Sequence, residues 1–239
     1  MKKVLVVLPF LFLLSCKRNS PPNNDIITPV NYGYITDLNI TEQYNINNSN
    51  ILIFNGRFAT AAFTKVVLND PRTVGRSFNI DSVLFNNKIL TVDFIPYYMT
   101  YTDTIPLTPY PPFVWNIRGS SEYPSYKDTI TDSIPKFTTY SSVPDSISQS
   151  GSTSLLLGST NADSVSIVFN DNPQSGGYWV KNLSCASNSV MVEIPAGLTL
   201  ITNGKMYFTF FKKYFKMVSN KKINYEISAV YTKTISIVH

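Results

Sequence analysis

The sequence predicts an all-β protein, and three observations support that fold class. The chain of 239 residues contains 15 Tyr and 15 Phe, residue types that favour strands. Glycine is scarce, at 10 residues, and Asn, Ser and Pro separate the apolar runs as turn formers do. No stretch of about a dozen residues repeats its apolar side chains with the period of a helix. We expect two β-sandwich domains, at residues 30–138 and 139–239.

The first half is predicted to form strands separated by short turns. Asn86-Asn87 makes the turn between the last two of these strands, because asparagine tolerates positive φ. Four prolines within 105–112 lack amide donors, so this segment is expected to be a loop or a sheet edge, followed by a strand at 113–119. The earlier strands are predicted at 32–40, 50–54, 57–68, 78–85 and 88–94.

The second half contains the strongest alternation, at residues 223–238, where one face is apolar and the other polar. Such a pattern indicates a half-buried strand. Residues 205–218 are expected to pair with it as a hairpin through 219–222, and Asn203-Gly204 is a tight-turn signal. The apolar face consists of Ile223, Tyr225, Ile227, Ala229 and Tyr231. Shorter strands are predicted at 154–157, 163–170, 178–183 and 190–194.

The number and spacing of strands after residue 150 suit a Greek-key sandwich. The run Val192-Glu193-Ile194-Pro195-Ala196-Gly197, followed by a turn and a long hairpin, resembles the immunoglobulin-like modules of Bacteroidetes-type surface lipoproteins. The sequence lacks the Cys…Trp…Cys core of antibody domains. The resemblance implies an immunoglobulin-like C-terminal domain.

The N-terminus has the order of parts found in a secretory signal. Two lysines precede an apolar run at 4–14, which is shorter than the roughly 20 residues of a membrane-spanning helix. The run ends in Leu13-Leu14-Ser15-Cys16, which resembles the lipobox of bacterial lipoprotein precursors. The resemblance implies removal of a signal peptide at residues 1–15 and attachment of lipid to the Cys16 thiol.

Residues 16–29 follow as a polar segment rich in Pro and Asn, which we interpret as a flexible tether between the membrane and the folded body. Lys17 stands where lipoproteins retained in the inner membrane of enteric bacteria carry Asp, so outer-membrane placement is expected. The family's surface-export signal is acidic, and residues 17–20 are not, which leaves the periplasmic and surface faces both open.

Composition argues against catalysis and against nucleic acid. The only histidine is His239, so Ser-His and Cys-His catalysts lack their base and His-containing zinc sites lack ligands. A carboxylate pair for glycoside hydrolysis stays open, but none stands out among the 15 acidic residues. Without Lys2 and Lys3 of the signal peptide, 18 basic residues face 15 acidic ones, an excess too small to indicate nucleic-acid binding. We expect no enzyme activity, metal or cofactor, and a buried thiol at Cys185, which lacks a disulfide partner once Cys16 carries lipid.

Six triplets share the pattern Asp, then Ser or Thr, then an aliphatic residue. The pattern resembles the O-glycosylation acceptor of Bacteroidetes-type bacteria. The alternative is turn chemistry, because Asp and Ser often form turns ahead of strands. The hydroxyl residues are Ser82, Thr104, Thr129, Ser133, Ser146 and Ser164. All except Ser82 and Ser164 lie in a part predicted to be irregular and are expected to be accessible; those two are expected to be partly shielded by a sheet.

Aromatic residues crowd the segment 97–126, around the prolines. In one interpretation Tyr110, Trp115 and Tyr123 stack on sugar rings. In the other, these rings pack in the core, where large aromatic side chains contribute most of the buried area.

Five lysines alternate with aromatic residues in the C-terminal hairpin. They are Lys212, Lys213, Lys216, Lys221 and Lys222. One interpretation is contact with anionic lipid headgroups or lipopolysaccharide. The other is protection of an exposed strand from edge-to-edge pairing.

These features together predict a lipid-anchored lipoprotein of the cell envelope with a non-catalytic binding or structural role. Its expected partners are the membrane, through the lipid on Cys16, and a glycan or another envelope protein. One alternative is a surface glycan-binding accessory lipoprotein, as in starch-utilisation-type systems. The other is an adhesin or a subunit of an assembled surface appendage.

Overall fold

The computed structural model describes residues 32–67, 76–77, 80–95, 98–104, 111–121, 123–170, 178–185, 188–197, 203–218 and 221–238. Seventeen strands confirm the all-β fold class, and the one helix among these residues is a short 3-10 turn, η1 (Tyr140–Ser142). The strands are β1 (Tyr32–Ile46), β2 (Leu52–Val67), β3 (Arg76–Ser77), β4 (Ser82–Phe85), β5 (Lys88–Ile89), β6 (Thr91–Ile95), β7 (Tyr98–Thr104), β8 (Phe113–Arg118), β9 (Tyr126–Ile130), β10 (Lys136–Phe137), β11 (Ser146–Ser148), β12 (Thr153–Thr160), β13 (Ser164–Asn170), β14 (Tyr178–Ser184), β15 (Ser189–Ile194), β16 (Asn203–Val218) and β17 (Lys221–Val238). Tyr32–His239 form one compact unit.

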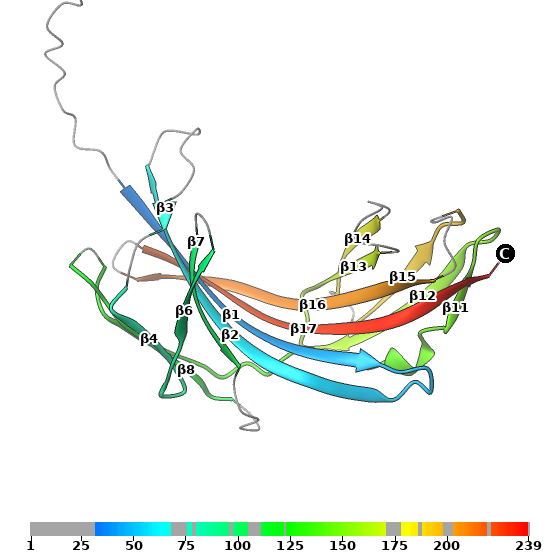
Figure 1. Cartoon of the computed structure of the whole chain (residues 1–239), viewed down its shortest axis with the longest axis horizontal. Helices are drawn as coiled ribbons and strands as arrows, with labels where there is room; N and C mark the ends of the chain where they lie inside the picture. The colour runs from blue at the N-terminus through cyan, green and yellow to red at the C-terminus, as the bar shows by residue number, and fades with distance from the viewer. Residues whose placement is uncertain are drawn as a thin grey trace, which may run out of the picture. The chain divides into compact units, whose positions relative to one another are not determined.

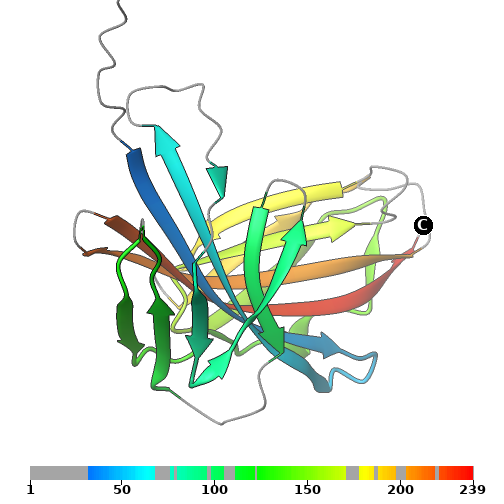
Figure 2. The same ribbon diagram turned by 60° about the vertical axis from the view of Figure 1, so that its left-hand side comes forward.

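Ten strands form the main sheet, in the order β14-β13-β16-β17-β1-β2-β7-β6, with β11 paired to β17 and β3 paired to β2. Its four long strands, β1, β2, β16 and β17, run side by side (Figure 1, Figure 2). β1 and β17 are parallel, from Ile35 opposite Lys222 to Ile46 opposite Lys233. The first and the last strands of the chain are therefore direct neighbours.

The main sheet crosses the predicted domain boundary. β1 belongs to the predicted N-terminal domain and β17 to the C-terminal one, so the two segments share this sheet. Each segment therefore needs the other as a hydrogen-bonded neighbour for one of its long strands. The boundary between residues 138 and 139 and the immunoglobulin-like character of the second domain stay predictions. The predicted signal peptide and the predicted tether, residues 1–29, lie outside the described residues.

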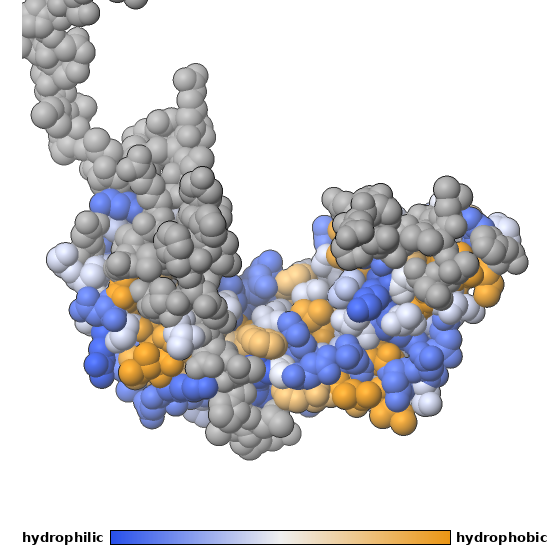
Figure 3. All heavy atoms as spheres, in the orientation of Figure 1, coloured by the Kyte–Doolittle hydropathy of each residue, from blue (hydrophilic) through white to orange (hydrophobic). Residues whose placement is uncertain are grey.

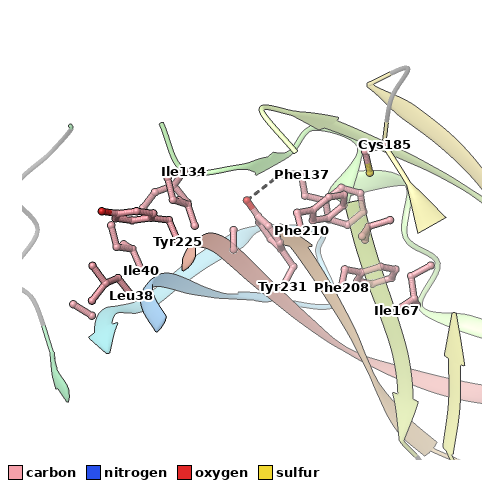
Figure 4. Close-up of a cluster of buried hydrophobic side chains, with 14 of the residues drawn as sticks. Leu38, Ile40, Ile134, Phe137, Ile167, Cys185, Phe208, Phe210, Tyr225 and Tyr231 are labelled. Carbon is pink, nitrogen blue, oxygen red and sulfur yellow. Dashed lines mark hydrogen bonds between the residues drawn. The ribbon is translucent and has the colours of Figure 1, made fainter. Parts of the chain in front are cut away.

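Two smaller sheets complete the unit, in the orders β5-β4-β8-β9 and β10-β12-β15. The second is joined to the main sheet by an aromatic cluster (Figure 4). Phe137 of β10 lies 5.2 Å from Phe208, 4.9 Å from Phe210 and 5.5 Å from Tyr231, measured between ring centroids. The Phe137 amide also donates to the Tyr231 hydroxyl at 3.1 Å. The buried side chains of all three sheets form one continuous core.

The alternation predicted for the last strand is confirmed. The five residues of its apolar face are between 0% and 2% exposed. Full burial of an isoleucine side chain such as Ile223 or Ile227 contributes about 1.5–3 kcal/mol to folding. The hairpin of β16 and β17 is confirmed as well, in a continuous register from Asn203 opposite Ser236 to Val218 opposite Lys221.

Two predicted turns have different outcomes. Asn86 and Asn87 form the predicted turn, with φ of 48° and 65°, as two-residue hairpin turns require. The turn predicted at Asn203-Gly204 is wrong, because both residues lie in β16. Gly204 is needed there for packing: a Cβ on it would stand 2.5 Å from Cζ of Phe169.

The surface mixes polar and apolar side chains. On the face turned to the viewer in Figure 3, hydrophobic residues form small groups among hydrophilic ones. Isolated exposed apolar residues are normal for soluble proteins and carry no functional signal by themselves. No helix among the described residues has the length and hydrophobicity to cross a membrane.

Candidate functional site

A buried ion pair lies between β1 and β2. Glu42 and Arg57 are directly opposite in the antiparallel register, and their side chains are 9% and 6% exposed. Arg57 Nε donates to Glu42 Oε1 at 2.9 Å, and Nη2 donates to the same oxygen. The Tyr44 hydroxyl donates to Glu42 Oε2 at 2.5 Å, so both carboxylate oxygens accept hydrogen bonds. Charges removed from water in this way require close partners, because an isolated buried charge is strongly unfavourable.

A β-bulge brings two aromatic rings to the same face as the ion pair. The register of β1 and β2 shifts between Gln43, which faces Gly56, and Tyr44, which faces Phe54. Asn55 is therefore the extra residue of the bulge. As a result Tyr44 and Phe54 are direct neighbours, with ring centroids 5.4 Å apart in an edge-to-face arrangement. Without the bulge, Asn55 would face Tyr44.

The ion pair and the two rings line a cavity of about 490 Å³. Ligand pockets commonly measure roughly 300–1,000 Å³. The other walls come from the start of β8, the link between β9 and β10, β10 itself and the end of β12. They contribute Pro111, Phe113, Ser133, Ile134, Lys136 and Thr160. Phe113 and Ile134 are buried, whereas Ser133, Lys136 and Thr160 are exposed, so polar side chains mark the open side.

The ion pair is held in place by packing and by protonated hydroxyls. Burial, followed by the hydrogen bond to Glu42 and its charge, raises the pKa of Tyr44 well above its ordinary value, so this hydroxyl remains a donor. The Tyr44 ring stacks on Tyr231 at 4.9 Å. Burial raises the pKa of Tyr231 to about 12. The Arg57 guanidinium carbon lies 5.8 Å from the centroid of the Phe113 ring, within cation-π range.

The cavity thus combines aromatic and aliphatic walls with a carboxylate, a guanidinium and several hydroxyls. A ligand with an apolar ring face and polar substituents around its rim matches both kinds of wall. In the part of the chain that the structure describes, no three His, Cys, Asp or Glu side chains lie together as a metal site. The chemistry of the lining is that of recognition through hydrogen bonds and ring contacts.

The residues that define this cavity were missed by the sequence prediction, although a signal existed. Glu42 follows Leu38 and Ile40 at a spacing of two, and Arg57 precedes Ala59 in the same way. In both strands a charged residue takes an inward position where the alternation calls for an apolar one. The predicted strand 32–40 ends before Glu42, so the sequence prediction does not place Glu42 on the inward face of a strand.

The structure corrects the predicted ligand-binding aromatics. Trp115 and Tyr123 are 0% and 2% exposed, so neither ring presents a face to a ligand in solution. Trp115 packs edge to face against Phe85 at 4.8 Å, on the inward side of β8. The Tyr123 hydroxyl forms a 2.7 Å hydrogen bond with Thr36 Oγ1. These two rings are core residues, and Tyr110 lies outside the described residues.

The candidate O-glycosylation residues divide by exposure. The exposed side chains are those of Thr129, Ser133 and Ser146, and the half-buried ones are those of Ser82 and Ser164. Nothing is described of the Thr104 side chain. The prediction of irregular surroundings is wrong for three of them, because Thr104, Thr129 and Ser146 lie in β7, β9 and β11. Ser133 lies in a link between strands, where its Oγ accepts a hydrogen bond from Asn161 Nδ2 at 3.0 Å. Modification of these residues stays a prediction.

Cys185 is buried, as the sequence predicted, with 1% of its surface exposed. Burial raises the pKa of its thiol, which lowers the fraction of reactive thiolate.

The chain matches no known protein-family model and no curated protein sequence. Its function therefore has to be inferred from its own residues.

Proposed function

We propose that this protein is a cell-envelope lipoprotein, anchored in the outer membrane by lipid on Cys16, that binds a ligand without catalysis. The observation that carries the binding role is the 490 Å³ cavity with a hydrogen-bonded Glu42–Arg57 pair beneath two aromatic rings. The support for the anchor is the sequence Leu13-Leu14-Ser15-Cys16 after a short apolar run. An acylated protein of this kind stays on the membrane and presents its cavity to the surrounding compartment.

The ligand class that the cavity fits best is a sugar residue of a glycan. The C–H face of a sugar ring packs against aromatic side chains such as Phe54 and Tyr44, which line the cavity together. Sugar hydroxyls both donate and accept, so they match a carboxylate, a guanidinium and the hydroxyls of Ser133 and Thr160. These contacts support a glycan-binding role for the cavity, and the buried Trp115 is not part of it.

A glycan array tests the binding role. The probe is the chain from residue 16 onward, with Cys16→Ser so that no lipid is attached. We expect binding to a subset of glycans, lost in Phe54→Ala and in the double variant Glu42→Met/Arg57→Met. The control is Leu156→Ala, which removes an exposed side chain outside the cavity lining. No binding to plant, host or bacterial glycans, or binding unchanged in both cavity variants, rejects this ligand class.

Palmitate labelling tests the anchor independently of the ligand. Cells expressing the wild-type chain are expected to incorporate labelled palmitate into the protein, and cells expressing Cys16→Ala are not. Equal labelling of the two would reject lipid attachment at Cys16. Membrane fractionation of the same cells then assigns the labelled protein to the inner or the outer membrane.

Assembly into a larger surface structure is the second candidate, and one observation favours it. Leu156 and Met191 face each other across β12 and β15 and are 46% and 61% exposed. β15 ends its sheet among the described strands, so this apolar pair lies beside a sheet edge. Sedimentation of the unlipidated chain at increasing concentration tests this candidate. Association that Leu156→Ser/Met191→Ser abolishes supports it, and a monomer at every concentration rejects it.

Intact-mass measurement on protein purified from its native host tests the O-glycosylation prediction. Added sugar mass is expected first at exposed Ser133, Thr129 and Ser146. A glycosyltransferase needs the hydroxyl in solvent and some local freedom of the backbone, which favours Ser133 in its link over residues within strands. A mass explained by polypeptide and lipid alone would assign the triplets to turn chemistry.

A further inference from the structure

One end of the main sheet combines basic and exposed apolar side chains. This hairpin end comprises residues 32–35 of β1, 64–67 of β2, 215–218 of β16 and 221–223 of β17. The registers place these stretches side by side, with Ile35 opposite both Thr64 and Lys222. The tip of the β16–β17 hairpin and the start of β1 lie at the same end in both ribbon views (Figure 1, Figure 2).

The charge of the hairpin end is positive. Its four stretches contain four lysines and no aspartate or glutamate. Lys222 is exposed, and its Nζ lies 5.1 Å from the centroid of the Phe215 ring. Lys221 Nζ lies 3.7 Å from the centroid of Tyr34 and 5.2 Å from that of Tyr123, so these rings hold its charge in position. Lys216 pairs with Asp128 at 2.5 Å, so the charge of this lysine is compensated.

Acidic side chains on the adjoining surface already have partners. Glu226 pairs with Lys213 at 2.8 Å, and Asp37 accepts a hydrogen bond from Asn224 Nδ2 at 2.8 Å. Both lie further from the tip than Lys222. Lys213 compensates the charge of Glu226, whereas Asn224 is a neutral partner for Asp37. Within the four stretches of the hairpin end, the charged side chains are lysines.

Large apolar side chains stand beside Lys222, on the opposite face of the sheet from Lys221, because consecutive strand residues point to opposite faces. Phe215 and Met217 are 61% and 60% exposed. They alternate along β16 and share one face, and the register sets Met217 opposite Lys222. Exposed apolar residues next to lysines form the combination that binds the boundary between lipid headgroups and acyl chains.

The start of β1 lies at the hairpin end. β1 begins at Tyr32, so the segment from the predicted lipid site at Cys16 joins the folded unit at the hairpin end. β1 then runs away from this end, parallel to β17. If lipid is attached at Cys16, the hairpin end is the part of the folded unit that the fewest residues separate from the lipid.

We infer that the hairpin end meets a membrane end-on, with Lys222, Phe215 and Met217 on one face of the sheet and Lys221 on the other. The lysines bind anionic lipid headgroups, and Phe215 and Met217 insert at the interface. A lipid anchor combined with a basic surface patch binds a membrane more tightly than the anchor alone, and the second contact restricts the orientation of the protein. The inference rests on the proposed lipid anchor only for the direction in which this end faces. The lipid-binding surface itself does not need the anchor.

Vesicle co-sedimentation of the unlipidated chain, from residue 16 with Cys16→Ser, tests the surface. We expect binding to phosphatidylcholine vesicles that contain phosphatidylglycerol and much weaker binding to phosphatidylcholine alone. Lys222→Gln should weaken binding about fivefold, since each lysine near an anionic surface contributes about that factor. Phe215→Ser/Met217→Ser should weaken it on the order of tenfold or more. The matched control is Ile51→Ser/Ile53→Ser, which removes two exposed apolar residues, 58% and 47% exposed, near the opposite end of β1.

A tryptophan reporter tests the orientation. In Met217→Trp the new indole should shift its emission to the blue on addition of anionic vesicles and be quenched by brominated lipids. In Ile51→Trp, at a position of similar exposure, neither change is expected. Equal binding to neutral and anionic vesicles, or a response of Ile51→Trp without one of Met217→Trp, overturns the inference. Since every variant lacks the lipid site, these results are independent of whether Cys16 is acylated in cells.

Discussion

Two aromatic regions of this protein look alike in the sequence and differ in the structure. Around Trp115 the ring of Phe85 packs against Trp115 and Phe113 at 4.8 and 5.9 Å, and Phe113 alone of these three rings also lines the cavity. Around Tyr44 the rings of Phe54 and Tyr231 pack at 4.9 to 5.4 Å, but beside a buried ion pair and an open cavity. The ring geometry is similar in both regions. The candidate site differs from the core region by the Glu42–Arg57 ion pair, because aromatic rings can pack without any buried charge.

The largest expected effect comes from emptying the apolar region. Trp115→Ala should destabilise the fold by about 3–5 kcal/mol, because it removes a fully buried indole and leaves a cavity. Trp115→Phe should cost much less, since a ring remains and Nε1 of Trp115, buried without a hydrogen-bond partner, is removed. Urea denaturation followed by circular dichroism measures both. A loss below about 1 kcal/mol in Trp115→Ala would show that this ring is not the centre of its cluster.

A similar loss is expected from breaking the ion pair on one side. Glu42→Ala leaves the Arg57 guanidinium buried without its carboxylate and should cost about 3 kcal/mol or more. Glu42→Met/Arg57→Met removes both charges and should recover most of that stability, because apolar residues of similar volume often replace a buried pair without loss. The double variant converts the cavity into a region like that around Trp115. We expect it to fold and to lose ligand binding, and a double variant that still binds would separate the charges from the function.

The sequence predicted the periodic parts of the fold and missed the parts that depend on non-periodic contacts. The alternation at residues 223–238 and the turn at Asn86-Asn87 are local, so sequence alone sufficed for them. The parallel pairing of β1 with β17 joins two segments that are far apart in the sequence, and no local pattern encodes it. The bulge at Asn55 has the same character, since a shift of one residue changes which side chains face the core.

The candidate site was harder to predict than the fold for a physical reason. Aromatic residues mark both cores and ligand sites, so their density near Trp115 did not distinguish the two. A charge on the inward face of a strand is rarer and more informative, because burying it is unfavourable unless a partner is present. Glu42 and Arg57 meet that description, but their pairing depends on the register of β1 and β2, which the sequence leaves open.

The smallest expected effect concerns a second polar contact, between Asp128 of β9 and the main sheet. Asp128 Oδ2 accepts hydrogen bonds from Lys216 Nζ at 2.5 Å and from the Tyr225 hydroxyl at 2.6 Å. Burial alone would raise the pKa of Asp128, but these hydrogen bonds outweigh it and hold the pKa below its ordinary value. The charged form is therefore favoured in the folded state.

The pH dependence of this contact follows from the sign of that shift. Because the folded-state pKa of Asp128 is below the unfolded one, its contribution is present above about pH 4 and is lost as the pH falls through the folded-state value. Asp128→Asn should cost about 1 kcal/mol at pH 7, since Lys216 is partly exposed and its ion pair is screened by water. Urea midpoints measured from pH 7 to pH 3 should converge for wild type and Asp128→Asn at the acid end. A difference between the two urea midpoints that stays constant over this range would mean that the charge of Asp128 does not contribute to stability. The contact would then stabilise the fold through packing and uncharged hydrogen bonds.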